Sequence, residues 1–127
     1  MKYIELLKIK EKLTKITAEP LKNVPVNARK DLFFLTKKVN EYIEFYSNEQ
    51  LRFAKMFGKL QDNGTVMFEG ETKEEKETNA QPFITAMTEL NETEIEIEKV
   101  SIGCENLTEI SVDDMIVLSP IIDFFSL

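Results

Sequence analysis

The sequence contains no histidine, a single cysteine and only four glycines among its 127 residues. Without histidine the chain cannot build a Ser-His-Asp or Cys-His nucleophile or the usual zinc sites. Cys104 has neither a CxxC companion nor a disulfide partner, so we interpret it as a small buried or half-buried residue. Neither GxxxxGKS/T nor GxGxxG occurs, which excludes the common glycine-rich phosphate-binding loops. We therefore expect no enzyme activity, no metal site and no cofactor.

Long apolar runs are also missing. No stretch of about 18 apolar residues occurs, which argues against a membrane span. The first residues, MKYIELLKIKEKL, mix charges into apolar positions, unlike a signal peptide. At 43% hydrophobic residues, a chain of this length carries enough apolar surface for one domain spanning residues 1–127. Together with the lone cysteine, these features predict a single-domain protein in a reducing, cytoplasmic setting.

The net charge of −7 conceals a division of charge along the chain. Residues 1–60 hold 13 Lys/Arg and 7 Asp/Glu, whereas residues 61–127 hold 3 Lys/Arg and 16 Asp/Glu. Such asymmetry affects association and solubility rather than fold. Two interpretations follow: the halves attract each other within the monomer, or the acidic half offers a surface to a basic partner.

The first half reads as helical. Leu6, Ile9, Leu13 and Ile16 form one apolar stripe, which predicts a helix over residues 3–18. Glu19-Pro20 should end it, because the residue before proline is disfavoured in helical geometry. Asn27 is a candidate N-cap for a very long second helix over residues 28–59. The short connector predicts an antiparallel helical hairpin. The long helix should either bend near residues 47–48 or project and pair with another chain.

The second half, residues 61–127, reads as mixed α/β. Asp62-Asn63-Gly64 is a turn signal, and residues 65–68 are a candidate strand. Residues 70–79 are almost wholly polar, which predicts a mobile acidic loop. A short helix over residues 79–90 would follow, with Pro82 in its first turn. Ser111 to Asp114 resembles a capping box for a last short helix, which Pro120 should bend or end, and the apolar tail after it should be docked.

An acidic ladder stands between these two helices. Glu94, Glu96 and Glu98 alternate with Ile95 and Ile97, the pattern of a half-buried strand whose isoleucines face the core. The phase then slips, and a bulge at residues 98–99 would restore it. Residues 66–68 are the simplest antiparallel partner. Successive glutamates would lie about 6.8 Å apart, too far for two of them to hold one Mg²⁺ without other ligands. The ladder is therefore either a solvated face or a protein-binding face.

The layout resembles a family of small uncharacterised proteins from phages and prophages of Gram-positive bacteria. The resemblance is carried by the opening MKYIELLKIKEKLTKI, the helix ARKDLFFLTKKVNEYIEFYSNEQLRFAKMFG with its downstream DNG turn, and the segments PFITAMTELNETEIEIEKVSI and LTEISVDDMIVLSPII. It covers nearly the whole chain. None of these segments is a catalytic signature, so the resemblance implies phage origin and assigns no functional residue.

The sequence therefore predicts an α+β fold with a helical hairpin, one long helix, a small antiparallel β element and two short C-terminal helices. The first functional hypothesis is a non-enzymatic phage protein that binds a host protein with a basic groove and inhibits a defence system. A second is a virion or tail-assembly protein that forms a homo-oligomer through the long helix, with Phe33, Phe34, Phe45 and Phe57 partly exposed. A third is a nucleic-acid-binding accessory protein, which the acidic balance disfavours. The candidate partner-binding residues are Glu94, Glu96, Glu98, Glu71, Glu74, Glu75 and Glu77.

Overall fold

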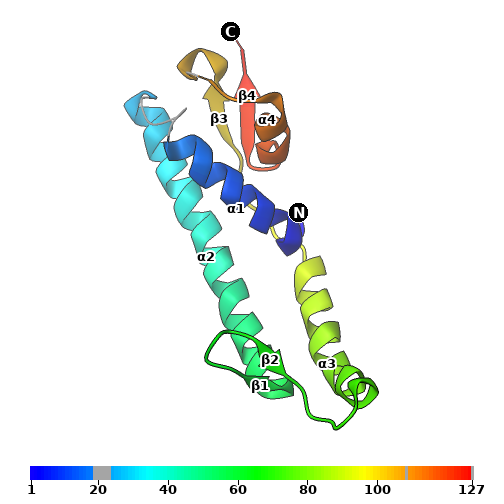
Figure 1. Ribbon diagram of the computed structural model, residues 1–127. Helices are drawn as coiled ribbons and strands as arrows, with labels where there is room; N and C mark the ends of the chain where they lie inside the picture. Colours follow the sequence, from blue (N-terminus) through cyan, green and yellow to red (C-terminus); the bar gives the residue numbers. More distant parts are fainter. Residues whose placement is uncertain (19–23, 108, 127) are drawn as a thin grey trace. The chain divides into compact units, whose positions relative to one another are not determined.

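The computed structural model describes residues 1–18, 24–107 and 109–126. Within these ranges the chain is an α+β protein, as the sequence predicted at the level of class (Figure 1). Its elements are α1 (Tyr3–Ala18), α2 (Val26–Phe57), β1 (Lys59–Leu60), β2 (Val66–Met67), α3 (Lys73–Glu92), β3 (Val100–Gly103), the 3-10 helix η1 (Cys104–Asn106), α4 (Val112–Leu118) and β4 (Ile122–Phe125). In the part of the chain that is described, no helix is both long enough and apolar enough to cross a membrane.

The chain divides into two compact units. Unit 1 comprises Met1–Ile43 and Glu94–Leu127, and unit 2 comprises Glu44–Thr93.

The core of unit 1 forms around α1. Its predicted stripe is confirmed: Leu6, Ile9, Leu13 and Ile16 are all buried. Helix α4 packs against α1, and the buried residues Ile102, Leu118, Ile121 and Ile122 complete the core. The predicted end of α1 at Glu19-Pro20 lies outside the described residues, although the last described helical residue is Ala18. The expected end of the final helix is confirmed, because α4 stops at Leu118, before Pro120.

Strands β3 and β4 pair in parallel, with Val100 opposite Ile122 and Gly103 opposite Phe125. This pairing docks the apolar tail, as expected, but the parallel pair itself was not predicted. Parallel strands are normally buried, which agrees with the buried side chains of Ile102 and Ile122.

Helix α2 begins two residues earlier than predicted. Its first residue is Val26, and the Arg29 N–H donates to the carbonyl of Pro25 (2.9 Å). Asn27 is therefore the second helical residue, and the prediction that it is the N-cap is wrong. Pro25 suits a helix start because that position needs no N–H donor. In unit 1, the buried face of α2 consists of Leu32, Leu35 and Val39.

In unit 2, β1 and β2 form an antiparallel hairpin across the predicted turn. Lys59 pairs with Met67 and Leu60 with Val66. Asn63 Oδ1 accepts hydrogen bonds from the Thr65 N–H (3.1 Å) and hydroxyl (2.7 Å), and Gly64 has a positive φ of 86°. The prediction that residues 66–68 pair with the acidic ladder is wrong, because β1 is a closer partner along the chain and the short turn brings it directly opposite.

Helix α3 begins much earlier than predicted. The expected acidic loop over residues 70–79 is wrong for its larger part, because α3 starts at Lys73. Pro82 lies inside this helix rather than in its first turn, and at 20 residues α3 is not short. Its start is fixed by Thr72, whose hydroxyl accepts from the Glu75 N–H (3.1 Å). Near its end, the Tyr46 hydroxyl donates to Asn91 Oδ1 (2.6 Å), which joins α3 to the second half of α2.

Candidate protein-binding site

The ladder residues of unit 1 form an extended segment that is fastened to the start of the chain. The Ile95 N–H donates to the Met1 carbonyl (2.7 Å), and Lys2 and Glu94 form an isolated antiparallel bridge. The main chain therefore lies against the start of the chain rather than in a sheet. The predicted strand and its bulge at residues 98–99 are wrong, because regular strand geometry begins only at Val100.

The predicted alternation of burial is nevertheless present. Ile95 is buried and Ile97 is half-buried, whereas Glu94, Glu96 and Glu98 are all exposed. Glu94 Oε2 lies 3.1 Å from the Met1 nitrogen. The structure thus presents three carboxylates along one extended segment whose two isoleucines face inward.

Helix α2 holds the middle of this segment through Tyr42. Its hydroxyl donates to the carbonyl of Glu96 (3.2 Å), and its ring meets that of Tyr3 edge-on at a centroid distance of 6.1 Å. Lys38 Nζ lies 5.5 Å from the Tyr42 ring centroid. Burial raises the pKa of the Tyr3 phenol, and the nearby Tyr42 adds to this effect. Tyr42 fixes where the Glu96 main chain lies, and this contact between distant segments was not predictable from sequence.

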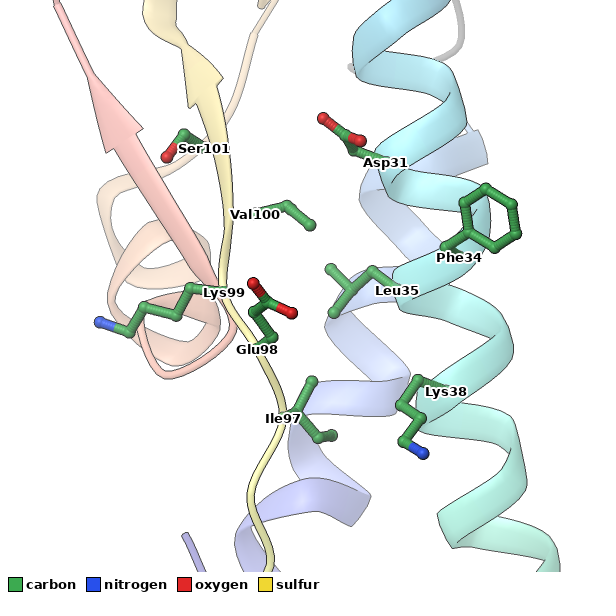
Figure 2. A pocket seen from close by; sticks show the side chains of 9 residues that line it. All are labelled: Asp31, Phe34, Leu35, Lys38, Ile97, Glu98, Lys99, Val100 and Ser101. Carbon is green, nitrogen blue, oxygen red and sulfur yellow. The ribbon is translucent and has the colours of Figure 1, made fainter.

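A groove of about 560 Å³ lies between this segment and α2 (Figure 2). Its α2 side comprises Asp31, Phe34, Leu35 and Lys38, and its other side is formed by residues 97–101. Ile97 and Val100 point toward α2, and Leu35 of α2 points toward them, so apolar side chains face each other across the groove. Asp31 and Glu98 add two carboxylates to its lining. A second hollow of about 530 Å³ is lined by Met1, Ile95, Glu96, Ile97, Glu98 and Pro120. Glu98 borders both.

The other predicted site residues, Glu71, Glu74, Glu75 and Glu77, belong to unit 2 and surround the start of α3. All four are exposed. Glu75 Oε2 accepts from the Glu71 N–H (2.8 Å), so with Thr72 it completes a variant of the capping box. Glu77 Oε1 lies 4.0 Å from Lys73 Nζ. Negative side chains in the first turn also favour the helix dipole, which gives Glu74 and Glu75 a structural role.

A buried carboxylate, Asp114, was missed by sequence reasoning. Ser111 caps α4 as predicted, accepting from the Asp114 N–H (3.1 Å). The Asp114 side chain, however, turns to α1, where its oxygens lie 3.0 Å from Lys12 Nζ and 3.6 Å from Lys15 Nζ. The hydrogen bond with Lys12 is the main cause that lowers the pKa of Asp114 and raises the pKa of Lys12. The available signal was a pair of lysines beside the α1 stripe and an aspartate three residues after Ser111.

No cluster of three or more Asp, Glu, Cys or His side chains able to hold a metal ion occurs among the described residues. No family model matches the chain, and comparisons with curated proteins and with solved structures also find no match.

Proposed function

We propose that this protein is a non-enzymatic phage protein that acts inside the host cytoplasm by binding a host protein. Its contact face is the acidic ladder of Glu94, Glu96 and Glu98, and its effect is to inhibit a host defence system. The partner offers a basic groove that complements these carboxylates. The glutamates around the start of α3 form a second acidic contact surface on unit 2.

The observation that carries the proposal is that the ladder presents exposed glutamate side chains on an anchored main chain. Glu94, Glu96 and Glu98 are exposed, while Ile95 is buried and the Glu96 carbonyl is held by Tyr42 (3.2 Å). Charged side chains on an anchored main chain lose less conformational freedom on binding than those on a free loop. Complementary charge also accelerates encounter with a basic partner.

The test is partner capture with charge-reversed variants. We expect Glu94→Lys/Glu96→Lys/Glu98→Lys to lose the partner that the wild-type chain captures from prophage-carrying host cells. The matched control is Glu44→Lys/Glu89→Lys/Glu109→Lys, which changes net charge equally at exposed glutamates elsewhere. Equal capture by a folded ladder variant would remove the ladder from the contact surface.

The second acidic surface has its own variant. Glu71→Lys/Glu74→Lys/Glu77→Lys reverses three charges and leaves Glu75, which bonds the Glu71 N–H, in place. Loss of capture here, with α3 helicity retained by circular dichroism, would assign these glutamates to the contact. Unchanged capture would restrict the contact to the ladder.

Self-association through α2 is a second candidate function, favoured by exposed aromatic side chains. Phe33 and Phe34 are 64% and 57% exposed, and their rings meet edge-on at 5.4 Å. Phe45 is also exposed, and Phe57 is half-buried. In this alternative α2 is one long helix that pairs with a second copy, as expected of a virion or tail-assembly protein. Light scattering tests it: a defined oligomer that Phe33→Ser/Phe34→Ser dissociates supports it, and a strict monomer at high concentration rejects it.

The antiparallel hairpin of α1 and α2 also belongs to the proposal. The Tyr3–Tyr42 ring contact and the hydrogen bond from Lys10 Nζ to Asn40 Oδ1 support it. A double-mutant cycle on Tyr3 and Tyr42 measures the coupling that this arrangement requires.

A further inference from the structure

We propose that the groove between α2 and β3 binds an extended basic segment of the protein partner, which adds as a new strand to the free edge of β3. This inference rests on the proposed function and specifies how the partner is held. It follows from the main-chain geometry of β3, from the directions of the side chains and from the charges at the groove.

The hydrogen-bonding pattern shows which main-chain groups are free. The Val100 N–H donates to the Ile121 carbonyl (3.1 Å), and β3 and β4 pair in parallel from Val100 to Gly103. In a parallel ladder, the N–H and C=O of every second residue face the neighbouring strand. Val100 and Ile102 therefore bond β4, and the N–H and C=O of Ser101 face away from it. Within the described residues β3 pairs with β4 alone, so its other edge can accept a strand.

The side chains lead to the same conclusion. Figure 2 shows Lys99 and Ser101 directed away from α2, although both residues line the groove. Their main-chain atoms are therefore what the groove exposes. The neighbouring segment is equally available, since the described part of the chain offers no main-chain hydrogen bond to Ile97, Glu98 or Lys99.

The charges select the occupant. Lys38 Nζ already has Glu41 Oε2 at 3.8 Å and the Tyr42 ring beside it. By contrast, no ion pair with another described residue engages Asp31 or Glu98, the two carboxylates at the groove, and the ammonium group of Lys99 is directed away from α2. A segment with a basic side chain would neutralise them.

The apolar side chains add the remaining contact. Phe34, Leu35, Ile97 and Val100 line the same groove. Because successive side chains of a strand point to opposite faces, an added strand places every second side chain against these residues and the others toward solvent. The occupant that fits is thus an extended peptide segment with apolar residues alternating with basic ones.

The probe for the test is a fluorescein-labelled, end-capped heptapeptide of alternating valine and lysine. We expect it to bind the wild-type chain, with a roughly tenfold loss of affinity in Ser101→Pro, the scale of about one net hydrogen bond. This substitution removes an N–H that β4 does not use, and proline is tolerated at strand edges. Ser101→Ala is the matched control and should bind as the wild type does, because the side chain points away from the groove.

Two further arms keep the test decisive if Ser101→Pro perturbs the fold. A peptide N-methylated at every second residue cannot donate along one edge, and we expect it to lose binding to the unmodified protein. A heptapeptide of alternating valine and glutamate should fail to bind. Glu98→Lys should weaken binding of the valine–lysine peptide, whereas the control Glu109→Lys should leave its binding unchanged. Equal binding of the N-methylated and parent peptides would overturn strand addition, and equal binding of the acidic peptide would overturn the charge argument.

The captured host partner separates this inference from the proposed function. Loss of capture in the ladder triple variant together with loss in Ser101→Pro supports both. Loss in the triple variant with full capture by Ser101→Pro overturns strand addition and leaves the acidic face standing. A wild-type dimer that Ser101→Pro converts to a monomer would identify the occupant as a second copy of this chain, which also overturns the inference.

Discussion

Replacing Leu118 by alanine should destabilise unit 1 severely, because the fully buried Leu118 side chain (0% exposed) lies at the end of α4, which packs on α1. The substitution removes about three methylene equivalents, or roughly 2.4 kcal/mol of transfer free energy at about 0.8 kcal/mol each. The cavity that remains adds to this, so we expect a loss of about 3–4 kcal/mol in the free energy of unfolding. Such a loss is a large fraction of the stability of an ordinary domain.

The assay is urea unfolding followed by circular dichroism at 222 nm, with hydrogen exchange to locate the loss. Ile116→Ala is the control, since Ile116 lies on the same short helix but is 63% exposed. It should change stability by less than about 0.5 kcal/mol. We expect faster exchange in α4, β3 and β4 for Leu118→Ala alone. Equal effects of the two substitutions would refute the assignment of the α4 face that forms the core.

Two contacts and the net charge of −7 each give a further prediction. Because the pKa of Asp114 is lowered in the folded state, its ionised form stabilises the protein above the ordinary pKa of 3.8, and this contribution is lost as the pH falls through the lower folded pKa. Asp114→Asn should therefore flatten the dependence of the urea midpoint on pH in the acid range. Parallel curves for the wild type and the variant would contradict the ion pair with Lys12. Gly58→Ala should destabilise the β1–β2 hairpin by about 1–3 kcal/mol, because the alanine Cβ would lie 2.6 Å from Val66 Cγ1 and 2.9 Å from the Met67 carbonyl oxygen. Unchanged hydrogen exchange in the hairpin would show that the site relaxes around the added methyl group. Fluorescence titration against DNA and RNA at low ionic strength should show no salt-sensitive binding, and a steep salt dependence would revive the nucleic-acid hypothesis.

Elements set by nearby residues were predictable from sequence. The α1 stripe, the turn at Gly64 and the cap of α4 each depend on residues within a few positions of one another. The inward direction of Ile95 was also predictable, because alternation in an extended chain requires no knowledge of the partner.

The start of α3 was missed although its signal was present. Thr72 and Glu75 are spaced as a capping box, but the polar composition of residues 70–79 suggested a loop. Glutamate and lysine are good helix formers, so charge alone does not argue against a helix. Pro82 misled further, since proline usually marks a first turn. Here it is an exposed residue in the interior of α3.

Contacts between distant segments were not predictable. The parallel pairing of β3 with β4 requires a choice of partner about twenty residues away, and two short apolar strands carry no register signal. The ion pairs of Asp114 with Lys12 and Lys15 join α4 to α1 across most of the sequence. The groove could not be predicted from sequence either, because α2 and residues 97–101 come together only in the folded unit.

Hydrogen exchange of the wild-type chain, measured residue by residue with and without its captured partner, tests the central claim most directly. If the protein works by offering the ladder and the free edge of β3, binding should slow exchange of the Ser101 amide and its neighbours in the segment from Glu96. The Val100 and Ile102 amides, already bonded to β4, should change little. A bound partner that leaves exchange at Ser101 and throughout residues 94–101 unaltered would contradict the account.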